Sequence, residues 1–144
     1  MQLKEVMSTR IETASPAESA AAAMARMRQS RIRHLVVRDG RRVVGVLSDR
    51  DVENLGSMAD VETVEDHMSR RVVTASPEMT LRKAANLMRG RSIGCLPVFS
   101  EGKLVGIVTT TDLLELIGRG TERPRTNSKR RRLEERHYLR RPRP

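Results

Sequence analysis

The feature that most constrains the fold of this 144-residue chain is an internal repeat. A segment that begins at Val6 aligns without a gap on a segment that begins at His67, 61 residues further along. The shared positions include Met7/Met68, Ser8/Ser69, Thr13–Pro16/Thr74–Pro77, Met27/Met88, Ile32/Ile93, Leu35/Leu96, Gly45/Gly106 and Asp51/Asp112. Self-similarity of this kind predicts two copies of one structural unit. Each copy, at about 55 residues, is marginal alone, so we expect the copies to pack together about a pseudo-twofold axis.

Each copy predicts the element order β-α-β-β-α, which is an α+β fold. Short strands over residues 11–14 and 72–75 precede the Ser-Pro pairs, and a helix follows each pair. Ser15 with Glu18 fits a capping box, and Ser19 and Thr80 fit N-caps one turn later. The helices carry apolar residues at a helical period: Ala20, Ala23, Met24 and Met27 in one copy, Leu81, Ala84, Ala85 and Met88 in the other.

A β-hairpin and a final helix complete each copy. The hairpin turns are expected at Asp39-Gly40 and Glu101-Gly102, and the final helices near Asp49 and Thr110. Each sheet is therefore predicted to have three strands packed on two helices. We divide the chain into a first repeat over residues 1–60, a second over 61–120, and a tail over 121–144.

Composition excludes several classes of protein. Aromatic residues are 1% of the chain and Trp is absent, so the core must be aliphatic, and nucleic-acid recognition by base stacking is not expected. The single cysteine, Cys95, excludes an internal disulfide framework and a cysteine-rich zinc site. Neither a membrane-spanning run nor a secretory signal is expected, and a reducing cytoplasm is the predicted location.

The net charge of +10 is concentrated in the tail. Residues 121–144 hold ten basic and three acidic residues, together with three prolines and few apolar residues. This composition indicates a solvated, disordered extension. The basic run Lys129, Arg130, Arg131 and Arg132 also fits a segment that binds a polyanion such as RNA or DNA.

The doubled order, together with a strand-ending Gly-x-x-Ser/Thr-x-x-Asp, resembles a tandem pair of cystathionine-β-synthase (CBS) domains. The matching blocks are MSTRIETASP, RIRHLVV and GVLSDRD in one copy, and MSRRVVTASP, SIGCLPV and GIVTTTD in the other. The resemblance covers residues 1 to about 120 and shows no fused catalytic domain. It implies a regulatory Bateman module that binds an adenosine-containing ligand in a cleft between the repeats.

The resemblance also implies the residues of the site. Asp51 and Asp112 would accept hydrogen bonds from ribose hydroxyls, while Ser48 and Thr109 would contact ribose or phosphate. Aliphatic strand residues would form the adenine slot. The other expected ligand-binding residues are Thr13, Arg31, Ile32, His34, Arg50, Thr74, Ile93, Cys95, Leu96, Pro97 and Thr111.

The two expected sites differ in charge. Arg31, Arg33, His34 and Arg50 of the first copy align with Ser92, Gly94, Cys95 and Thr111 of the second. The first set favours a polyphosphate, so we expect the sites to differ in affinity or ligand. Structural roles are open for the same residues: helix capping for Ser48, Asp51, Thr109 and Asp112, surface charge for the arginines, and core packing for Cys95.

We therefore expect a non-catalytic, homodimeric metabolite sensor that binds AMP, ADP, ATP, S-adenosylmethionine or a related ligand and requires no cofactor. The residues show no phosphate-binding glycine loop, metal-ligand spacing or nucleophilic triad. The alternative is a nucleic-acid-binding protein that acts through its basic tail.

Overall fold

The structure of the chain is a computed structural model that describes residues 1–119, and these residues form two compact units. Among the described residues, the β1–β3 unit consists of Ile11–Val72, and the β4–β5 unit consists of Met1–Arg10 together with residues 73–119. These units are defined by contacts in space, whereas the division at residue 60 is a prediction of the repeats in the sequence. The leading segment of each repeat belongs to the unit that contains the body of the other repeat.

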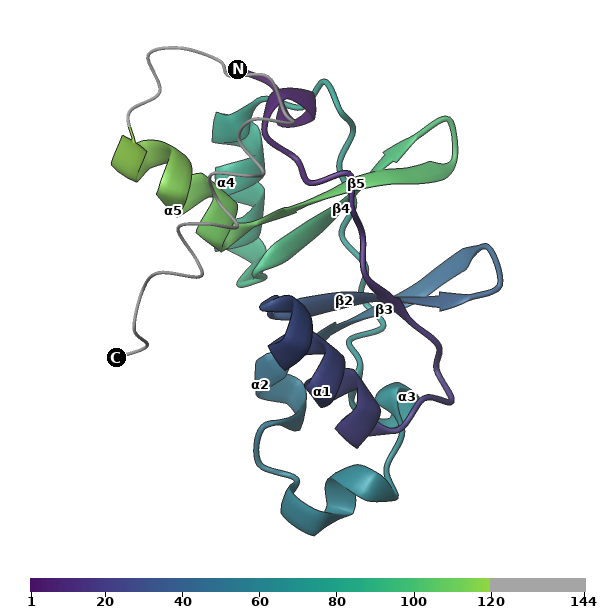
Figure 1. Cartoon of the computed structure of the whole chain (residues 1–144). Helices are drawn as coiled ribbons and strands as arrows, with labels where there is room; N and C mark the ends of the chain where they lie inside the picture. Colours follow the sequence, from purple (N-terminus) through teal and green to yellow (C-terminus); the bar gives the residue numbers. More distant parts are fainter. Residues whose placement is uncertain (120–144) are drawn as a thin grey trace. The chain divides into compact units, whose positions relative to one another are not determined.

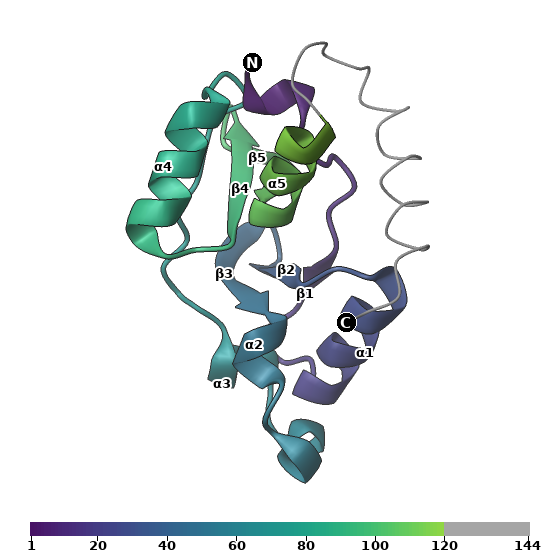
Figure 2. The same cartoon turned by 90° about the vertical axis from the view of Figure 1, so that its left-hand side faces the viewer.

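The β1–β3 unit contains a three-stranded sheet in the order β1-β2-β3. Strand β1 pairs parallel with β2, and β2 pairs antiparallel with β3. Helices α1 and α2 lie beside this sheet in both views (Figures 1 and 2). The elements are β1 (Thr13–Ala14), α1 (Ala20–Ser30), β2 (His34–Asp39), β3 (Arg42–Ser48), α2 (Asp49–Val52), η2 (Gly56–Asp60) and α3 (Val64–His67).

The β4–β5 unit contains a two-stranded antiparallel sheet, not the three strands that were expected. The strand expected over residues 72–75 is reduced to one parallel bridge between Ala75 and Val98. The strand expected over residues 11–14 is likewise shortened, to Thr13–Ala14. The elements of this unit are η1 (Leu3–Glu5), α4 (Leu81–Arg91), β4 (Cys95–Ser100), β5 (Lys103–Thr109) and α5 (Thr110–Arg119).

Backbone hydrogen bonds attach each leading segment to the hairpin of its unit. Ser69 exchanges two bonds with Val46 of β3, at 2.9 and 3.0 Å. Ser8 exchanges two bonds of 2.9 Å with Ile107 of β5. The leading segments thus extend the two hairpins in equivalent ways.

Two glycines allow this close approach. A Cβ atom at Gly45 would lie 2.7 Å from Met68 Sδ and 2.8 Å from the Ser69 carbonyl oxygen. A Cβ atom at Gly106 would lie 2.5 Å from Met7 Sδ. Each Gly in the Gly-x-x-Ser/Thr-x-x-Asp motif therefore has a packing role, since a side chain would occupy the space of the Met-Ser segment that crosses it.

The long helices α1 and α4 begin and end in the same way. Ser19 Oγ accepts a hydrogen bond from Ala22 N at 3.1 Å, and Thr80 Oγ1 accepts one from Lys83 N at 3.2 Å. The N-caps are thus the later of the two positions that the sequence left open. Arg31 follows α1 and has a φ of 55°, and Ser92 follows α4 and has a φ of 52°. Both residues are in the left-handed conformation, which is a common way for a helix to end.

Each unit has its own aliphatic core. Met27 and Met88 are 3% and 2% exposed, so the methionines on α1 and α4 pack as the helical period predicted. Within residues 1–119, every helix is too short or too polar to cross a membrane.

Candidate functional site

The first candidate site lies where β3 ends and α2 begins. Ser48 is the N-cap of α2, and its backbone N–H donates to Asp51 Oδ2 at 2.8 Å. Ser48 and Asp51 together form a capping box. The Asp51 side chain is exposed, and its Oδ1 accepts no hydrogen bond from residues 1–119. The capping role and an available carboxylate oxygen therefore coexist at this residue.

The second candidate site lies at the equivalent junction of β5 and α5. The Thr109 N–H donates to Asp112 Oδ2 at 2.8 Å, and the Asp112 N–H donates to Thr109 Oγ1 at 3.2 Å. Asp112 is partly buried, in contrast to Asp51. Burial raises the pKa of the Asp112 carboxyl, and the charge of Glu115 raises it further, although hydrogen bonds to the carboxyl from the Thr109 backbone and side chain lower it.

The start of β2 brings a histidine to the first junction. His34 lies opposite Ser48 in the antiparallel register, and the Asp49 N–H donates to the Arg33 carbonyl at 2.9 Å. Burial lowers the pKa of His34, while the charges of Asp49 and Asp51 raise it and that of Arg33 lowers it. The structure thus places an imidazole close to two carboxylates.

The first junction also carries three exposed arginines, whereas the second has uncharged residues in their place. Arg31, Arg33 and Arg50 are all exposed. The aligned residues of the second repeat are Ser92, Gly94 and Thr111. The charge difference expected between the two sites therefore lies on surfaces that solvent can reach.

Cys95 takes the place of His34 at the second junction. It lies opposite Thr109 in the register, and the Thr110 N–H donates to the Gly94 carbonyl at 3.0 Å. Cys95 is buried, and burial raises the pKa of its thiol to about 12. This cysteine is therefore a protonated, apolar residue at neutral pH.

The remaining expected site residues lie on the strands and in the cores. Thr13 is in β1, and Thr74 precedes Ala75 at the equivalent place. Ile32 and Ile93 are partly buried, whereas Leu96 and Pro97 are fully buried. Lys129, Arg130, Arg131 and Arg132 lie outside the described residues. Among residues 1–119, no three His, Cys, Asp or Glu side chains are grouped as metal ligands.

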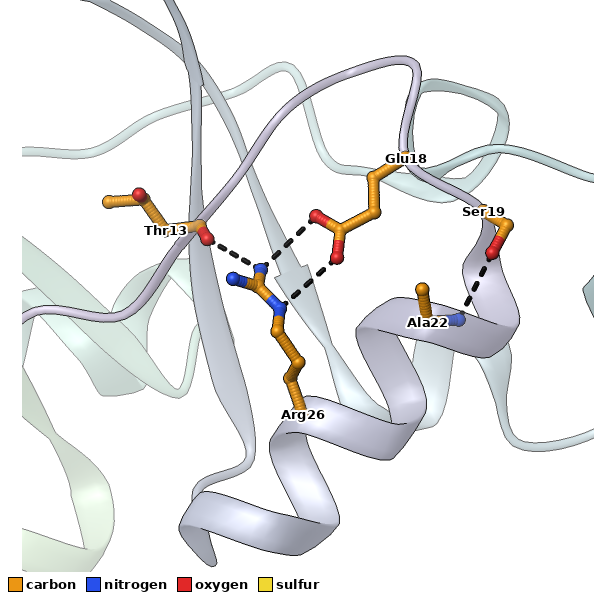
Figure 3. Close-up of polar contacts among 5 residues, drawn as sticks. All are labelled: Thr13, Glu18, Ser19, Ala22 and Arg26. Atoms are coloured by element: carbon orange, nitrogen blue, oxygen red, sulfur yellow. Dashed lines mark hydrogen bonds and ion pairs between the residues drawn. The ribbon is translucent and has the colours of Figure 1, made fainter.

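A polar cluster of Glu18 and Arg26, which the sequence did not predict, lies beside Thr13 (Figure 3). The Arg26 guanidinium on α1 donates to the Thr13 carbonyl oxygen at 2.5 Å and to Glu18 Oε2 at 3.1 Å. The alignment of the repeats carried a signal for this cluster, because Glu18 and Arg26 align with Met79 and Leu87. The two positions differ together between the repeats, as opposite charges in the first and as apolar residues in the second.

A sequence model of the CBS domain matches residues 3–55 and 64–119, and the chain belongs to this family. The CBS domain-containing protein YhcV of Bacillus subtilis is 32% identical over 114 residues, which cover 77% of this chain and 81% of YhcV. Protein MJ1225 of Methanocaldococcus jannaschii is 35% identical over 85 residues. That match covers 58% of this chain and only 30% of MJ1225.

Solved structures show the same architecture. The CBS domain pair of protein MJ0100, in complex with 5-methylthioadenosine and S-adenosyl-L-methionine, has a TM-score of 0.75 and 28% sequence identity. The comparison covers 82% of this chain and 96% of that one. The tandem α+β repeats and the family predicted from the sequence are thereby confirmed, and CBS pairs as a class are regulatory modules.

Proposed function

We propose that this protein is a non-catalytic regulatory module that binds an adenosine-containing ligand at its two strand-end junctions. The observation that carries the proposal is the pair of matching boxes, Ser48 with Asp51 and Thr109 with Asp112. In each box the aspartate uses Oδ2 to hold a backbone N–H, and this bond orients the carboxylate.

The remaining carboxylate oxygen is the group proposed to meet the ligand. Ribose presents two neighbouring hydroxyl donors, and an ionised carboxylate accepts such donors with charge-assisted strength. The exposed Arg31, Arg33 and Arg50 suit phosphate oxygens, whereas the second junction suits a ligand without phosphate. The adenosine compounds bound by the MJ0100 pair support this ligand class.

Binding would signal through a change of conformation and not through chemistry. A ligand shifts an equilibrium only as far as it prefers one arrangement. In each unit the proposed contacts lie at the first turn of a helix, α2 or α5, so ligand binding would act directly on the start of that helix. This regulation requires no cofactor.

The proposed partner is a second copy of the chain. Leu114 and Ile117 are each 69% exposed on α5, three residues apart and therefore on one face of the helix. Sedimentation of the wild type and of the L114E/I117E variant tests this part of the proposal. A dimer in the wild type that becomes a monomer in the variant supports it, and a monomeric wild type contradicts it.

The ligand proposal is tested by thermal unfolding of the full chain with AMP, ADP, ATP, S-adenosylmethionine, NAD and cyclic di-AMP, with GTP as the control. A ligand at 100 times its Kd stabilises the folded state by about 2.7 kcal/mol. We expect D51A and D112A each to reduce a selective adenine response, and D60A, which removes an exposed aspartate from η2, to leave it intact. Absence of any adenine-selective shift would contradict the proposal.

The basic tail supports a competing outcome of the same experiment. A variant with Lys129, Arg130, Arg131 and Arg132 replaced by alanine should keep the adenine-selective response. If the response instead follows phosphate number, includes GTP and disappears in this variant or at raised salt, the ligands bind as general polyanions.

A further inference from the structure

In the β1–β3 unit, Arg26 donates a hydrogen bond to the backbone carbonyl of Thr13 in the edge strand β1 (Figure 3). Arg26 Nε and Nη2 each lie 3.1 Å from a Glu18 carboxylate oxygen, and Nη2 also donates to Thr13 O. The Arg26 and Glu18 side chains are only 36% and 19% exposed. Nη2 makes the hydrogen bond to Glu18, whereas Nε forms an ion-pair contact without hydrogen-bond geometry. The shared Nη2 donor and the charge of Glu18 together hold the guanidinium against the Thr13 carbonyl.

The direction of this carbonyl follows from the strand pairing. The Val36 N–H of β2 donates to the Glu12 carbonyl at 3.3 Å. Successive carbonyls of a strand point to opposite sides, so the Thr13 carbonyl points away from β2, to the open edge of the sheet. Arg26 therefore fills the side from which a hydrogen-bond donor outside the sheet would approach.

The β4–β5 unit presents the same carbonyl without such a donor. The Ala75 N–H donates to the Pro97 carbonyl at 3.0 Å, and the Ala75 carbonyl accepts from the Phe99 N–H at 2.9 Å. Both groups of Ala75 therefore face β4, and the carbonyl of the preceding Thr74 points away from it. Within residues 1–119, no group donates to Thr74 O. The positions that would supply a clamp are Met79 and Leu87, which pack against the core of this unit.

We propose that the Glu18–Arg26 pair determines which purine bases the two sites accept. The open Thr74 carbonyl selects a 6-aminopurine, whereas the occupied Thr13 carbonyl makes the β1–β3 unit indifferent to the group at that position. This inference rests on the proposed function and on the expectation from the CBS resemblance that the strands around Thr13 and Thr74 receive the adenine base.

The selection has a simple chemical origin. The 6-amino group of adenine donates hydrogen bonds, and a backbone carbonyl is an acceptor only. The 6-oxo group of hypoxanthine is an acceptor and would leave the Thr74 carbonyl unsatisfied in a desolvated contact. At Thr13 the carbonyl already accepts from Arg26, so an oxo base leaves no unsatisfied acceptor there, and the penalty that disfavours it at Thr74 is absent.

AMP and IMP are the probes, because the two nucleotides differ only at this edge of the base, where IMP has a 6-oxo group and an N1–H in place of the 6-amino group and the bare N1 of AMP. Calorimetric titration of the full chain should show one site that prefers AMP by at least about tenfold and one site with similar affinity for both nucleotides. The E18M/R26L variant gives the first repeat the residues of the second, and should have two AMP-selective sites. The M79E/L87R variant makes the reverse exchange and should have none.

The E18M/R26L and M79E/L87R variants test the proposal independently. If one of them fails to fold, which thermal unfolding would show, the other still gives an answer. A purely structural role of the clamp would change affinity for AMP and IMP alike, without changing their ratio. The inference is overturned if AMP and IMP bind but the number of AMP-selective sites is the same in all three proteins. If neither nucleotide binds any of them while S-adenosylmethionine does, the proposed function stands and this inference fails. If no adenosine compound binds, both fail.

Discussion

The two strand-end junctions share their backbone geometry and differ in their surroundings. The bond from Ser48 N to Asp51 and that from Thr109 N to Asp112 are both 2.8 Å long. Yet Asp51 is exposed among arginines and beside His34, while Asp112 is partly buried near Cys95. Duplication preserved the element that places the carboxylate, and the side chains around it diverged.

This comparison separates what the fold requires from what a ligand would meet. The box and the glycine under the leading segment occur in both units because the chain path depends on them. The charges at the junction do not affect the path, so they were free to change. The differences between the repeats are therefore the better guide to ligand preference than the identities.

The largest expected effect compares the two glycines of the motif. G45A should destabilise the protein by about 2–3 kcal/mol, because its Cβ would lie 2.8 Å from a backbone oxygen of Ser69. G106A should cost about 1 kcal/mol, since the nearest backbone atom is 3.1 Å away and the closer contacts are with the movable Met7 side chain. Urea denaturation gives the free energies of unfolding.

Gly90 supplies the matched control for these variants. It lies in α4, and a Cβ there would meet nothing within 4 Å. G90A should therefore stabilise the protein by about 0.5–1 kcal/mol, through the higher helix propensity of alanine. Equal losses for G45A and G106A would show that the close approach of the backbone does not set the cost.

The helix caps should not distinguish the units. S19A and T80A each remove one hydrogen bond of similar length, 3.1 and 3.2 Å, at the start of an 11-residue helix. Each substitution should cost about 1 kcal/mol, as measured by denaturation, and S15A should cost much less. A larger loss for S15A than for S19A would place the N-cap of α1 at Ser15.

Asp112 should make stability depend on pH in one unit. Its folded pKa lies above 3.8, so the protonated carboxyl is favoured in the folded state. The stability it contributes is complete below pH 3.8 and is lost as the pH rises through the raised pKa. Relative to D112N, the wild type should therefore become less stable as the pH rises from about 3 to 7 in a denaturation series. A constant difference between the two proteins would contradict this assignment.

His34 should have the opposite dependence in the other unit. Its folded pKa lies below 6.5, so protonation favours the unfolded state. The stability that it contributes is present above pH 6.5 and is lost as the pH falls through the lowered pKa. As the pH falls from 6.5 through the lowered pKa, the free energy of unfolding of the wild type should therefore decrease relative to that of H34Q. An increase would show that the charges of Asp49 and Asp51 outweigh the effect of burial on the pKa of His34.

The smallest effect concerns the reactivity of Cys95, the single cysteine of the chain. A buried thiol with a pKa near 12 holds almost no thiolate at pH 8, so a disulfide reagent should label native protein slowly. Labelling should become rapid in urea. Fast labelling of the folded protein would show that the β4–β5 unit opens at β4.

Much of the fold could be predicted from the repeat and from local chemistry. The helix bounded by Ser19, the turn at Gly40 and the helix that starts after Thr80 all follow from residues that are near one another in sequence. The boxes at Ser48 and Thr109 were visible for the same reason, because their hydrogen bonds join residues three positions apart.

The sequence by itself determined the duplication, the α+β element order, the candidate caps and the difference in charge between the two junctions. Only the tertiary structure decided that residues 1–10 complete the β4–β5 unit, that Ala75 forms a bridge in place of a strand, and that Arg26 takes the Thr13 carbonyl. The physical reason is the distance in sequence between the residues that interact. Caps, turns and helical periods depend on neighbours within a few residues, whereas burial and these contacts depend on segments that meet only in the folded chain, such as Ser8 and Ile107.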